Sequence, residues 1–382
     1  MRIALLAPLI SAIAPPFLGG AQAMLADLAV GLAARGHDVT LYAADGSDVP
    51  GVRLVQSGID PATLRPARFM ETPGDTLLNT PSVSEDDDDL VRSTEAFLHT
   101  YRVIATHASE HNLVHAHAYD WPALVLASLQ PLPVVHTLHL PAVDRRINRA
   151  LETLASRTVP TPTHIVTVSH ACAATYATTC RIDAVIYNGI DTSRIPFGPS
   201  MTQRGDTSGE QEPYLLYAGR ITPEKGVEDA LEIAARAGYR LLLAGGIYDD
   251  AYFRSRIAPR LDQSRARYQG LVSRERLWEL MAGAVAVLCP VHWDEPFGLV
   301  ACEAQATGTP VVGYARGGLV EVVADGETGW LVPEGDVAGA VAAVGRISEV
   351  DRGACRRRAE TRFSMDAMLN AYEAFYRGML AV

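Results

Sequence analysis

Two glutamates flank a predicted strand-to-helix turn, with Glu295 just before the turn and Glu303 inside the helix that follows. The apolar run over residues 284–290 predicts a buried parallel strand directly upstream. At the helix start, the backbone N–H groups of Gly298 and Leu299 have no partner within the helix, which favours a bound anion. Carboxylates accept hydrogen bonds from hydroxyl groups, which ribose and sugar rings supply in number. The pattern therefore indicates a site for phosphate and sugar, and the alternative is two ordinary surface glutamates on a solvated helix.

A pair of basic residues follows the predicted strand over residues 214–218, in the segment that runs from Gly219-Arg220 to Lys225-Gly226. The guanidinium of Arg220 is a planar fork and the ammonium of Lys225 is a point charge, so together they could clamp a diphosphate. The alternative is a solvated loop that carries two ordinary basic residues.

The chain opens with a β-α-β pattern. A predicted strand over residues 2–7 leads into a loop that ends in Gly19-Gly20, and a helix is predicted over residues 21–34. No G-x-G triplet occurs anywhere in the sequence, which argues against a dinucleotide-binding fingerprint.

A histidine pair lies at the end of the predicted strand over residues 112–116. Alternate residues of a strand face opposite sides, so we expect His117 to open into a crevice and His115 to point into the fold. The alternative for His117 is a purely structural histidine.

The chain of 382 residues is long enough for two α/β domains. The stretch over residues 196–213 is rich in Pro, Gly, Ser and polar residues, which predicts a linker. We therefore expect one domain over residues 1–196, a second over residues 213–364 and a C-terminal helix over residues 365–382. Both domains show the pattern of doubly wound, Rossmann-like α/β sheets, whose ligands bind at the carboxyl ends of the strands. Two such domains that face each other would bring the candidate residues to one inter-domain cleft.

The composition excludes several classes of protein. The net charge of −11 argues against partners such as nucleic acid or anionic membranes. No apolar run reaches about 18 residues, so no integral membrane segment is expected. Five cysteines without a C-x-x-C spacing indicate a reduced compartment, and we expect a cytoplasmic protein. The acidic run over residues 85–89 is predicted to begin a helix rather than to follow a strand, so no metal-binding D-x-D site is expected.

The segment Glu295-Pro-Phe-Gly-Leu followed by Glu303 (E, seven residues, E) resembles the signature of glycosyltransferase family 4. Members of that family are retaining enzymes of the GT-B fold that use nucleotide-sugar donors. The segment that begins at Gly219 is similar to the diphosphate motif of the family, and Asn188-Gly-Ile-Asp resembles the element that closes its first domain. The resemblance implies that the first domain binds the acceptor, that the second binds the donor, and that the last helix crosses back to the first domain.

The resemblance also implies roles for individual residues of both domains. Those near the reacting groups are His117, Arg220, Lys225 and Glu295. Those that contact the donor are Gly19, Gly20, Asn188, Gly219, Gly245, Phe297, Gly298, Leu299 and Glu303.

We therefore predict a retaining glycosyltransferase that uses a nucleoside-diphosphate sugar of the UDP-glucose, UDP-GlcNAc or GDP-mannose type. The acceptor is a hydroxyl group of a small molecule, a glycan or a lipid. No metal and no further cofactor are expected, because basic residues and a helix start can neutralise the departing diphosphate. Two alternatives remain open: another GT-B enzyme, such as a nucleotide-sugar epimerase or a phosphorylase, and a two-domain protein that binds nucleotide sugar without catalysis.

Overall fold

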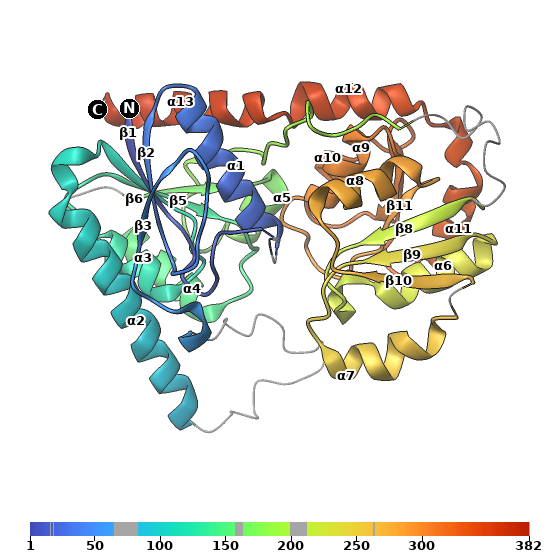
Figure 1. Ribbon diagram of the computed structural model, residues 1–382, viewed down its shortest axis with the longest axis horizontal. Coiled ribbons are helices and arrows are strands. Elements are labelled where there is room, and N and C mark those ends of the chain that lie inside the picture. The colour runs from blue at the N-terminus through green and yellow to red at the C-terminus, as the bar shows by residue number, and fades with distance from the viewer. Residues whose placement is uncertain are drawn as a thin grey trace. The chain divides into compact units, whose positions relative to one another are not determined.

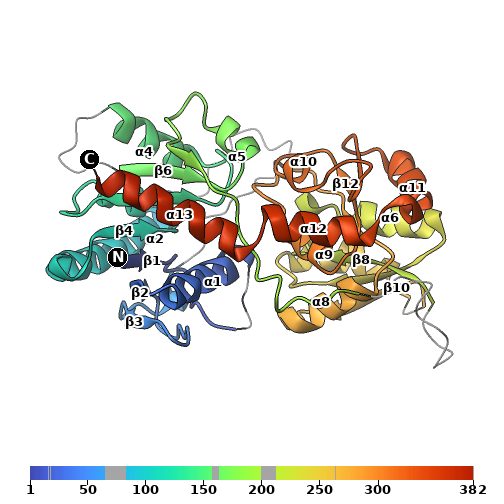
Figure 2. The same ribbon diagram turned by 90° about the horizontal axis from the view of Figure 1, so that it is seen from above.

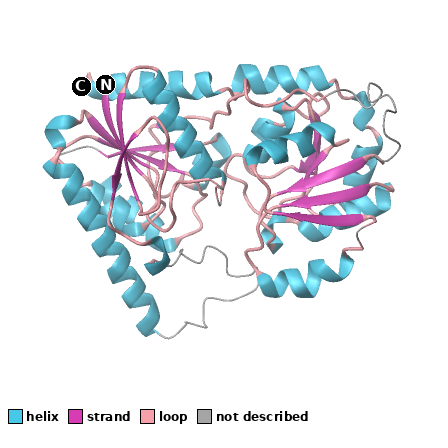
Figure 3. Ribbon diagram, viewed as in Figure 1, coloured by secondary structure: helices cyan, strands magenta, loops and turns pink. Residues whose placement is uncertain are grey.

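The computed structural model describes residues 1–15, 17, 19–64, 83–156, 163–198, 212–262 and 264–381. The chain divides into two compact units, Met1–Ile186 with Leu369–Val382, and Tyr187–Met368. Each unit is built around one sheet of parallel strands with helices packed on it (Figure 1), and the strands of the two sheets stand out in Figure 3. Within the described ranges, no helix is both long enough and apolar enough to cross a membrane.

The first unit contains a seven-stranded sheet in the order β3-β2-β1-β4-β5-β6-β7. Its strands are β1 (Arg2–Leu6), β2 (Asp38–Ala43), β3 (Arg53–Gln56), β4 (Leu113–Ala116), β5 (Val134–Leu138), β6 (Thr163–Thr167) and β7 (Ala184–Val185). Ile3 to Leu6 are fully buried, which explains why β1 is a continuous apolar run without alternation. The strand order reverses between β1 and β4, so the loops that follow these two neighbouring strands leave in opposite directions.

Helices cover this first sheet. They are α1 (Gly20–Ala34), α2 (Val83–Thr106), α3 (Trp121–Ala127), α4 (Arg145–Ser156), α5 (His170–Thr175) and the C-terminal α13 (Met365–Leu380). The buried face of α2, with Phe97 and Tyr101, packs in one core cluster with Leu6 and Val114 of the sheet. The acidic run over residues 85–89 lies in the first turns of α2, as predicted.

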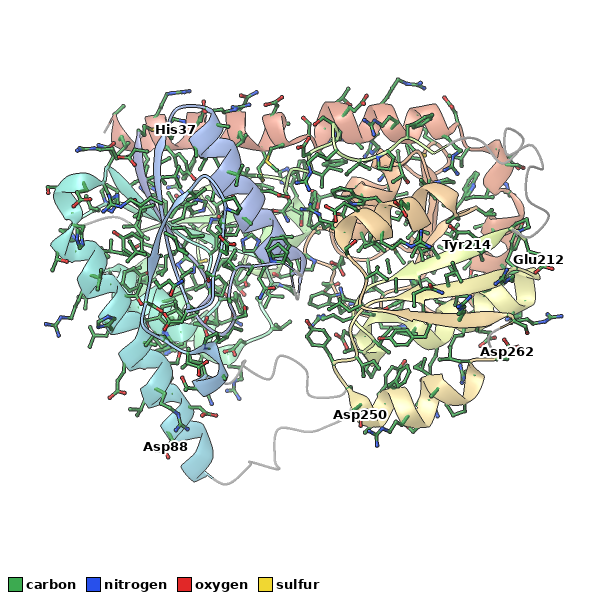
Figure 4. All side chains as sticks on the ribbon, in the orientation of Figure 1. His37, Asp88, Glu212, Tyr214, Asp250 and Asp262 are labelled. Atoms are coloured by element: carbon green, nitrogen blue, oxygen red, sulfur yellow. The ribbon has the colours of Figure 1, made fainter. Side chains whose placement is uncertain are left out.

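The C-terminal helix packs on the first unit from Leu369 onward. Tyr372 and Tyr376 are fully buried there. Nε2 of His37, which Figure 4 labels, lies 3.0 Å from the carboxylate of Glu373. This part of α13 runs between α1 and β6 (Figure 2), where Phe375 packs edge-on against the ring of His164. The predicted return of the last helix to the first half of the chain is therefore confirmed.

The second unit contains a six-stranded sheet in the order β10-β9-β8-β11-β12-β13. Its strands are β8 (Tyr214–Ala218), β9 (Arg240–Ala244), β10 (Ala266–Gly270), β11 (Val287–Cys289), β12 (Val311–Tyr314) and β13 (Gly329–Val332). Its helices are α6 (Val227–Ala237), α7 (Asp250–Tyr252), α8 (Arg274–Gly283), α9 (Leu299–Ala306), α10 (Leu319–Val322), α11 (Val337–Gly345) and α12 (Arg352–Arg362). The strand order reverses here between β8 and β11, which again are neighbours.

The division between the units falls at Ile186 and Tyr187, ahead of the predicted linker. The segment after Tyr187 groups with the second unit because it pairs with the residues that lead into α13. The N–H of Ile190 donates to the carbonyl of Phe363, and the N–H of Met365 donates to the carbonyl of Ile190, both over 2.9 Å. Residues 199–211 of the predicted linker lie outside the described residues.

Two glycines with left-handed backbone frame α6, Gly226 (φ +69°) before it and Gly238 (φ +76°) after it. Gly226 lies against the loop that follows β11, and a Cβ atom on it would lie 1.8 Å from the carbonyl oxygen of Pro290. A Cβ atom on Gly238 would meet no atom within 4 Å. Of these two glycines, only Gly226 therefore allows two loops to lie in close contact.

We predict that Gly226→Ala destabilises the protein more than Gly238→Ala does. Both substitutions place Ala in the left-handed region, which costs roughly 1–2 kcal/mol. Gly226→Ala must in addition displace the backbone at Pro290, and overpacking of this kind costs roughly 1–3 kcal/mol more. Chemical unfolding of both variants measures the difference, and equal losses of stability would show that the two loops do not constrain each other.

Candidate active site

The candidate residues of the second unit lie where its strand order reverses. The loop after β8 carries Arg220 and Lys225, and the loop after β11 carries Glu295. In open α/β sheets, ligands bind outside the carboxyl ends of the strands at such a reversal. Residues 70 positions apart in the chain are thus brought into direct contact.

Lys225 and Glu295 form the central ion pair of this site. The ammonium Nζ of Lys225 donates to Oε2 of Glu295 over 2.6 Å, and both side chains are about 15% exposed. Nε1 of Trp293 donates to the same oxygen over 2.8 Å, and Nζ of Lys225 lies 4.4 Å from the centre of the Trp293 ring. Oε2 therefore has two donors, whereas Oε1 has no hydrogen-bond partner in the described part of the chain and could accept from a ligand.

Lys225 is also the sole lysine of the sequence, so the other 32 of the 33 basic residues are arginines. Arginine and lysine are not equivalent, because the compact ammonium fits where the planar guanidinium does not. The single lysine contacts both Glu295 and Trp293. The presence of a single lysine is visible in the sequence, and it marks Lys225 as a position where a positive charge alone does not fulfil the role of the side chain.

Arg220 is the more exposed partner of the predicted clamp, with 37% of its side chain accessible. Its guanidinium lies 3.3 Å from the buried carboxylate of Glu224 and 5.6 Å from the centre of the Tyr248 ring. The predicted donor contacts Gly219 and Gly245 follow β8 and β9, and the N–H of Gly219 donates to the carbonyl of Ala244 over 3.0 Å. The two glycine loops thus continue the sheet side by side.

The loop that carries Glu295 is held in place by the loop after β12. A Cβ atom on Gly317 (φ +54°) would lie 2.3 Å from the carbonyl oxygen of Glu295, and the N–H of Gly318 donates to that oxygen over 2.5 Å. Arg316 from the same loop donates to the carboxylate of Asp294 over 2.9 Å. The glycine pair thus allows the close approach of two loops.

The start of α9 has the predicted geometry. Gly298 precedes the helix with left-handed backbone (φ +98°), and the helix begins at Leu299, whose N–H has no acceptor within the helix. The ring of Phe297 is 2% exposed and packs against the rings of Tyr187 and Phe363. Phe297 therefore offers only its backbone groups to a ligand.

Glu303 is 4% exposed and already has a cationic partner. Nε of Arg274, from the start of α8, donates to Oε1 of Glu303 over 3.1 Å, and the guanidinium of Arg274 stacks on Trp278 at 5.1 Å. The sequence did not single out Arg274, because nothing in its local pattern distinguishes it from Arg276, the other arginine of α8.

The candidate residues of the first unit also lie at a reversal of strand order. The loop after β1 leads to α1, where the N–H of Gly19 donates to the side chain of Gln22 over 3.0 Å and Gly20 begins the helix. His117 follows the neighbouring strand β4. The remaining predicted residue, Asn188, belongs to the second unit, and its buried Oδ1 has no hydrogen-bond partner among the described residues.

His117 is not open, as had been expected, but lies in the middle of a buried histidine chain that consists of His115, His117 and His139. It is 3% exposed, and both of its ring nitrogens are occupied. Its Nδ1 lies 2.9 Å from Nε2 of His139, and its Nε2 lies 3.3 Å from Nδ1 of His115. His139, which follows β5, is the least buried of the three and has a free Nδ1 among the described residues.

Burial controls the charge of these histidines. It holds the pKa of His115 and His117 well below the ordinary value, and neighbouring histidines lower both further. Burial, with a smaller contribution from His136, lowers the pKa of His139 to about 4. All three rings are therefore neutral near pH 7.

A carboxyl group with a raised pKa follows the same strand, three residues after His117. Burial raises the pKa of Asp120 to about 7, and the nearby carboxylate of Asp144 raises it as well. Asp120 precedes α3, but its side chain does not cap that helix. Across the ranges that the structure describes, no three His, Cys, Asp or Glu side chains are grouped as a metal site requires.

Comparisons with known proteins match both halves of the chain. A model described as Glycosyltransferase Family 4 matches residues 18–194, and one described as Glycosyl transferases group 1 matches residues 202–362. Glycogen synthase of Mycobacterium tuberculosis is 32% identical over 384 residues, which cover 90% of this chain and 86% of that protein. D-inositol 3-phosphate glycosyltransferase of Xylanimonas cellulosilytica is 32% identical over 406 residues, which cover 93% and 91%. The solved structure of sucrose-phosphate synthase from Thermosynechococcus elongatus matches 100% of both chains with a TM-score of 0.76 and 21% identity, a likeness of fold.

We predict that Asp120→Asn stabilises the protein at alkaline pH and has little effect in acid. Folding raises the pKa of Asp120 from 3.8 to about 7, so the neutral carboxyl is favoured by the folded state. That contribution is complete below about pH 4 and is lost as the pH rises through about 7. The difference in thermal midpoint between variant and wild type should therefore increase from about pH 4 to about pH 7 and stay constant at higher pH. Thermal unfolding across this range measures it, and a difference independent of pH would contradict the assignment.

Proposed function

Because this chain belongs to glycosyltransferase family 4 and has the GT-B fold, we propose that it transfers a sugar from a nucleoside-diphosphate sugar to an acceptor hydroxyl. We propose further that the anomeric configuration is retained and that no metal ion takes part. The observation that supports this best is the Lys225–Glu295 pair at the strand reversal of the second unit, beside the start of α9. It combines a cation for phosphate with a carboxylate for hydroxyl groups.

The departing diphosphate is the group that needs most stabilisation. Lys225 uses one N–H on Glu295 and keeps two for phosphate oxygens, while Arg220 is accessible enough to turn its fork toward them. The free N–H groups at the start of α9 add a partial positive charge. Lys225 and the N–H groups of α9 are held by the fold before the ligand arrives, which is what lowers the barrier of a charge-building step.

The two glutamates take different parts of the donor in this proposal. Glu295 has Oε1 free beside the cation and would accept from hydroxyls of the transferred sugar. Glu303 lies deeper, and its carboxylate, which Arg274 holds in place, would accept from the ribose hydroxyls.

The first unit supplies the acceptor site and a histidine in this proposal. His139 replaces His117 as the residue that meets the substrate, because both ring nitrogens of His117 are bound by its neighbours. His117 then orients His139. The names of the two relatives point to different acceptors, a glycogen chain and D-inositol 3-phosphate, so this chain's acceptor is left as a hydroxyl-bearing small molecule, glycan or lipid.

Family membership favours transfer over the epimerase, phosphorylase and non-catalytic alternatives, and a turnover assay tests it. Purified protein is incubated with UDP-glucose, UDP-GlcNAc or GDP-mannose, with candidate acceptors, and with or without EDTA. We expect release of nucleoside diphosphate and a glycosylated acceptor with one of these donors, unchanged by EDTA. Complete loss in EDTA, restored by Mn²⁺ or Mg²⁺, would contradict metal independence.

Variants of the single lysine serve as controls for that assay. Lys225→Ala should lower kcat/KM at least about tenfold, because a hydrogen bond to a charged group contributes roughly 1.5–3 kcal/mol. Lys225→Arg should not restore it, because the guanidinium does not fit between Glu295 and Trp293. Arg236→Ala, which removes an exposed cation paired with Glu232 in the same unit, should leave the rate unchanged.

We predict that Glu303→Gln and Glu295→Gln separate binding from turnover. Ribose contacts are equal in ground and transition states, so Glu303→Gln should weaken free nucleoside diphosphate and donor alike, by about 1.5–3 kcal/mol. Glu295→Gln should not weaken free nucleoside diphosphate, since it releases Lys225 from its carboxylate partner, but kcat should fall at least about tenfold.

Calorimetric titration beside steady-state kinetics measures both effects. Glu228→Gln, whose carboxylate pairs with Arg256 and Arg260 on the surface of the same unit, is the matched control. The opposite pattern, with nucleotide affinity lost in Glu295→Gln alone, would reverse the two assignments.

A further inference from the structure

A continuous line of hydrogen bonds joins the C-terminal helix to His139. The hydroxyl of Tyr376, on α13, lies 2.6 Å from Nδ1 of His115. That nitrogen also faces Nε2 of His117 at 3.3 Å, and Nδ1 of His117 faces Nε2 of His139 at 2.9 Å. The other nitrogen of His115, Nε2, lies 2.7 Å from the hydroxyl of Thr137.

The direction of the first hydrogen bond follows from the burial of Tyr376. Its side chain is fully buried, and within the described part of the chain its hydroxyl has a single hydrogen-bond partner, Nδ1 of His115. If Nδ1 carried a proton, the hydroxyl hydrogen would be buried without an acceptor, which is unfavourable. Tyr376 therefore donates, and Nδ1 of His115 is the acceptor.

The remaining directions follow one by one, because a neutral imidazole has one N–H and one lone pair. His115 must carry its proton on Nε2, where it donates to Thr137. Nε2 of His117 must carry a hydrogen, because a lone pair there would face the lone pair of His115 at 3.3 Å. This N–H and the hydroxyl of Tyr376 then share Nδ1 of His115 as their acceptor, the hydroxyl over the shorter distance. Nδ1 of His117 is then a lone pair, which accepts the Nε2–H of His139.

The chain of histidines thus ends in an acceptor. His139 carries its proton on Nε2, so its Nδ1, which has no partner among the described residues, is a lone pair. These directions apply to neutral rings, and burial lowers the pKa of all three histidines enough to keep them neutral near pH 7.

We propose that Tyr376 is a positioning residue that fixes the tautomers of His115, His117 and His139, so that His139 presents Nδ1 as a hydrogen-bond acceptor to a substrate hydroxyl. The proposal rests on the proposed function for the role of His139, but the tautomers themselves do not depend on it. It assigns to the C-terminal helix a part in orienting the site, in addition to its packing on the first unit.

Nitrogen-15 NMR of protein labelled at histidine tests the tautomers directly, since the two-bond couplings of a ring distinguish Nδ1–H from Nε2–H. In the wild type, the three histidines of the chain should all be Nε2–H, with the signals assigned through His139→Gln and His117→Gln. In Tyr376→Phe no hydroxyl fixes the direction of the hydrogen bonds along the histidine chain. His117 and His139 should then show mixed or Nδ1–H tautomers.

Two controls are built into the molecule. His136 donates Nε2–H to the carbonyl of Ala118, which can only accept, so its tautomer should be the same in every variant. Tyr101→Phe removes a buried hydroxyl that donates to the carbonyl of Ala123 in the same unit, outside the histidine chain. It should leave the tautomers of all three histidines as in the wild type.

Turnover supplies the second readout. Tyr376→Phe should lower kcat at least about fivefold and leave the affinity for free nucleoside diphosphate unchanged, while Tyr101→Phe changes neither. An Nδ1–H tautomer of His139 in the wild-type spectrum overturns the inference without any variant. Unchanged tautomers in folded Tyr376→Phe, or altered tautomers with an unchanged kcat, overturn the positioning role. If no donor is turned over at all, the proposed function fails, and the wild-type tautomers still decide the inference.

Discussion

The reversal of strand order in each parallel sheet is the constraint on which the candidate site depends. The chain adds strands first on one side of a central strand and then on the other, so the loops after the two central strands leave in opposite directions. The edge between them stays open, and the residues of those loops face each other. Lys225 and Glu295 meet there because β8 and β11 are neighbours, and the Gly19 loop and His117 follow β1 and β4 for the same reason.

Opposite charges are paired in the second unit before any ligand arrives. Lys225 has Glu295, Arg220 has Glu224, and Arg274 has Glu303. Each pair offsets part of the cost of keeping an ion partly buried. In the proposed function, a diphosphate would compete with the carboxylate of Glu295 for Lys225.

The candidate residues of the first unit are polar but not charged. Its central groups are neutral histidines, whose burial removes charge and leaves only the direction of hydrogen bonds to be specified. The tyrosines that complete this arrangement come from α13, more than 200 residues later in the sequence than the strands they contact. The packing of the last helix is thus tied to the chemistry of the first sheet.

The sequence by itself determined the elements and their order, because apolar runs, glycine turns and helix caps are local signals. β8 has the predicted bounds, and α9 begins at the predicted turn. The motif residues Arg220, Lys225 and Glu295 were found because they directly follow predicted strands. What the tertiary structure decided is which side chains are partners. Contacts between residues distant in sequence pair Arg274 with Glu303 and turn Phe297 inward. Such contacts also place His139 rather than His117 at the end of the histidine chain. Such contacts produce no periodic pattern in the sequence, because each depends on how whole elements pack and not on the residues next to it in the chain.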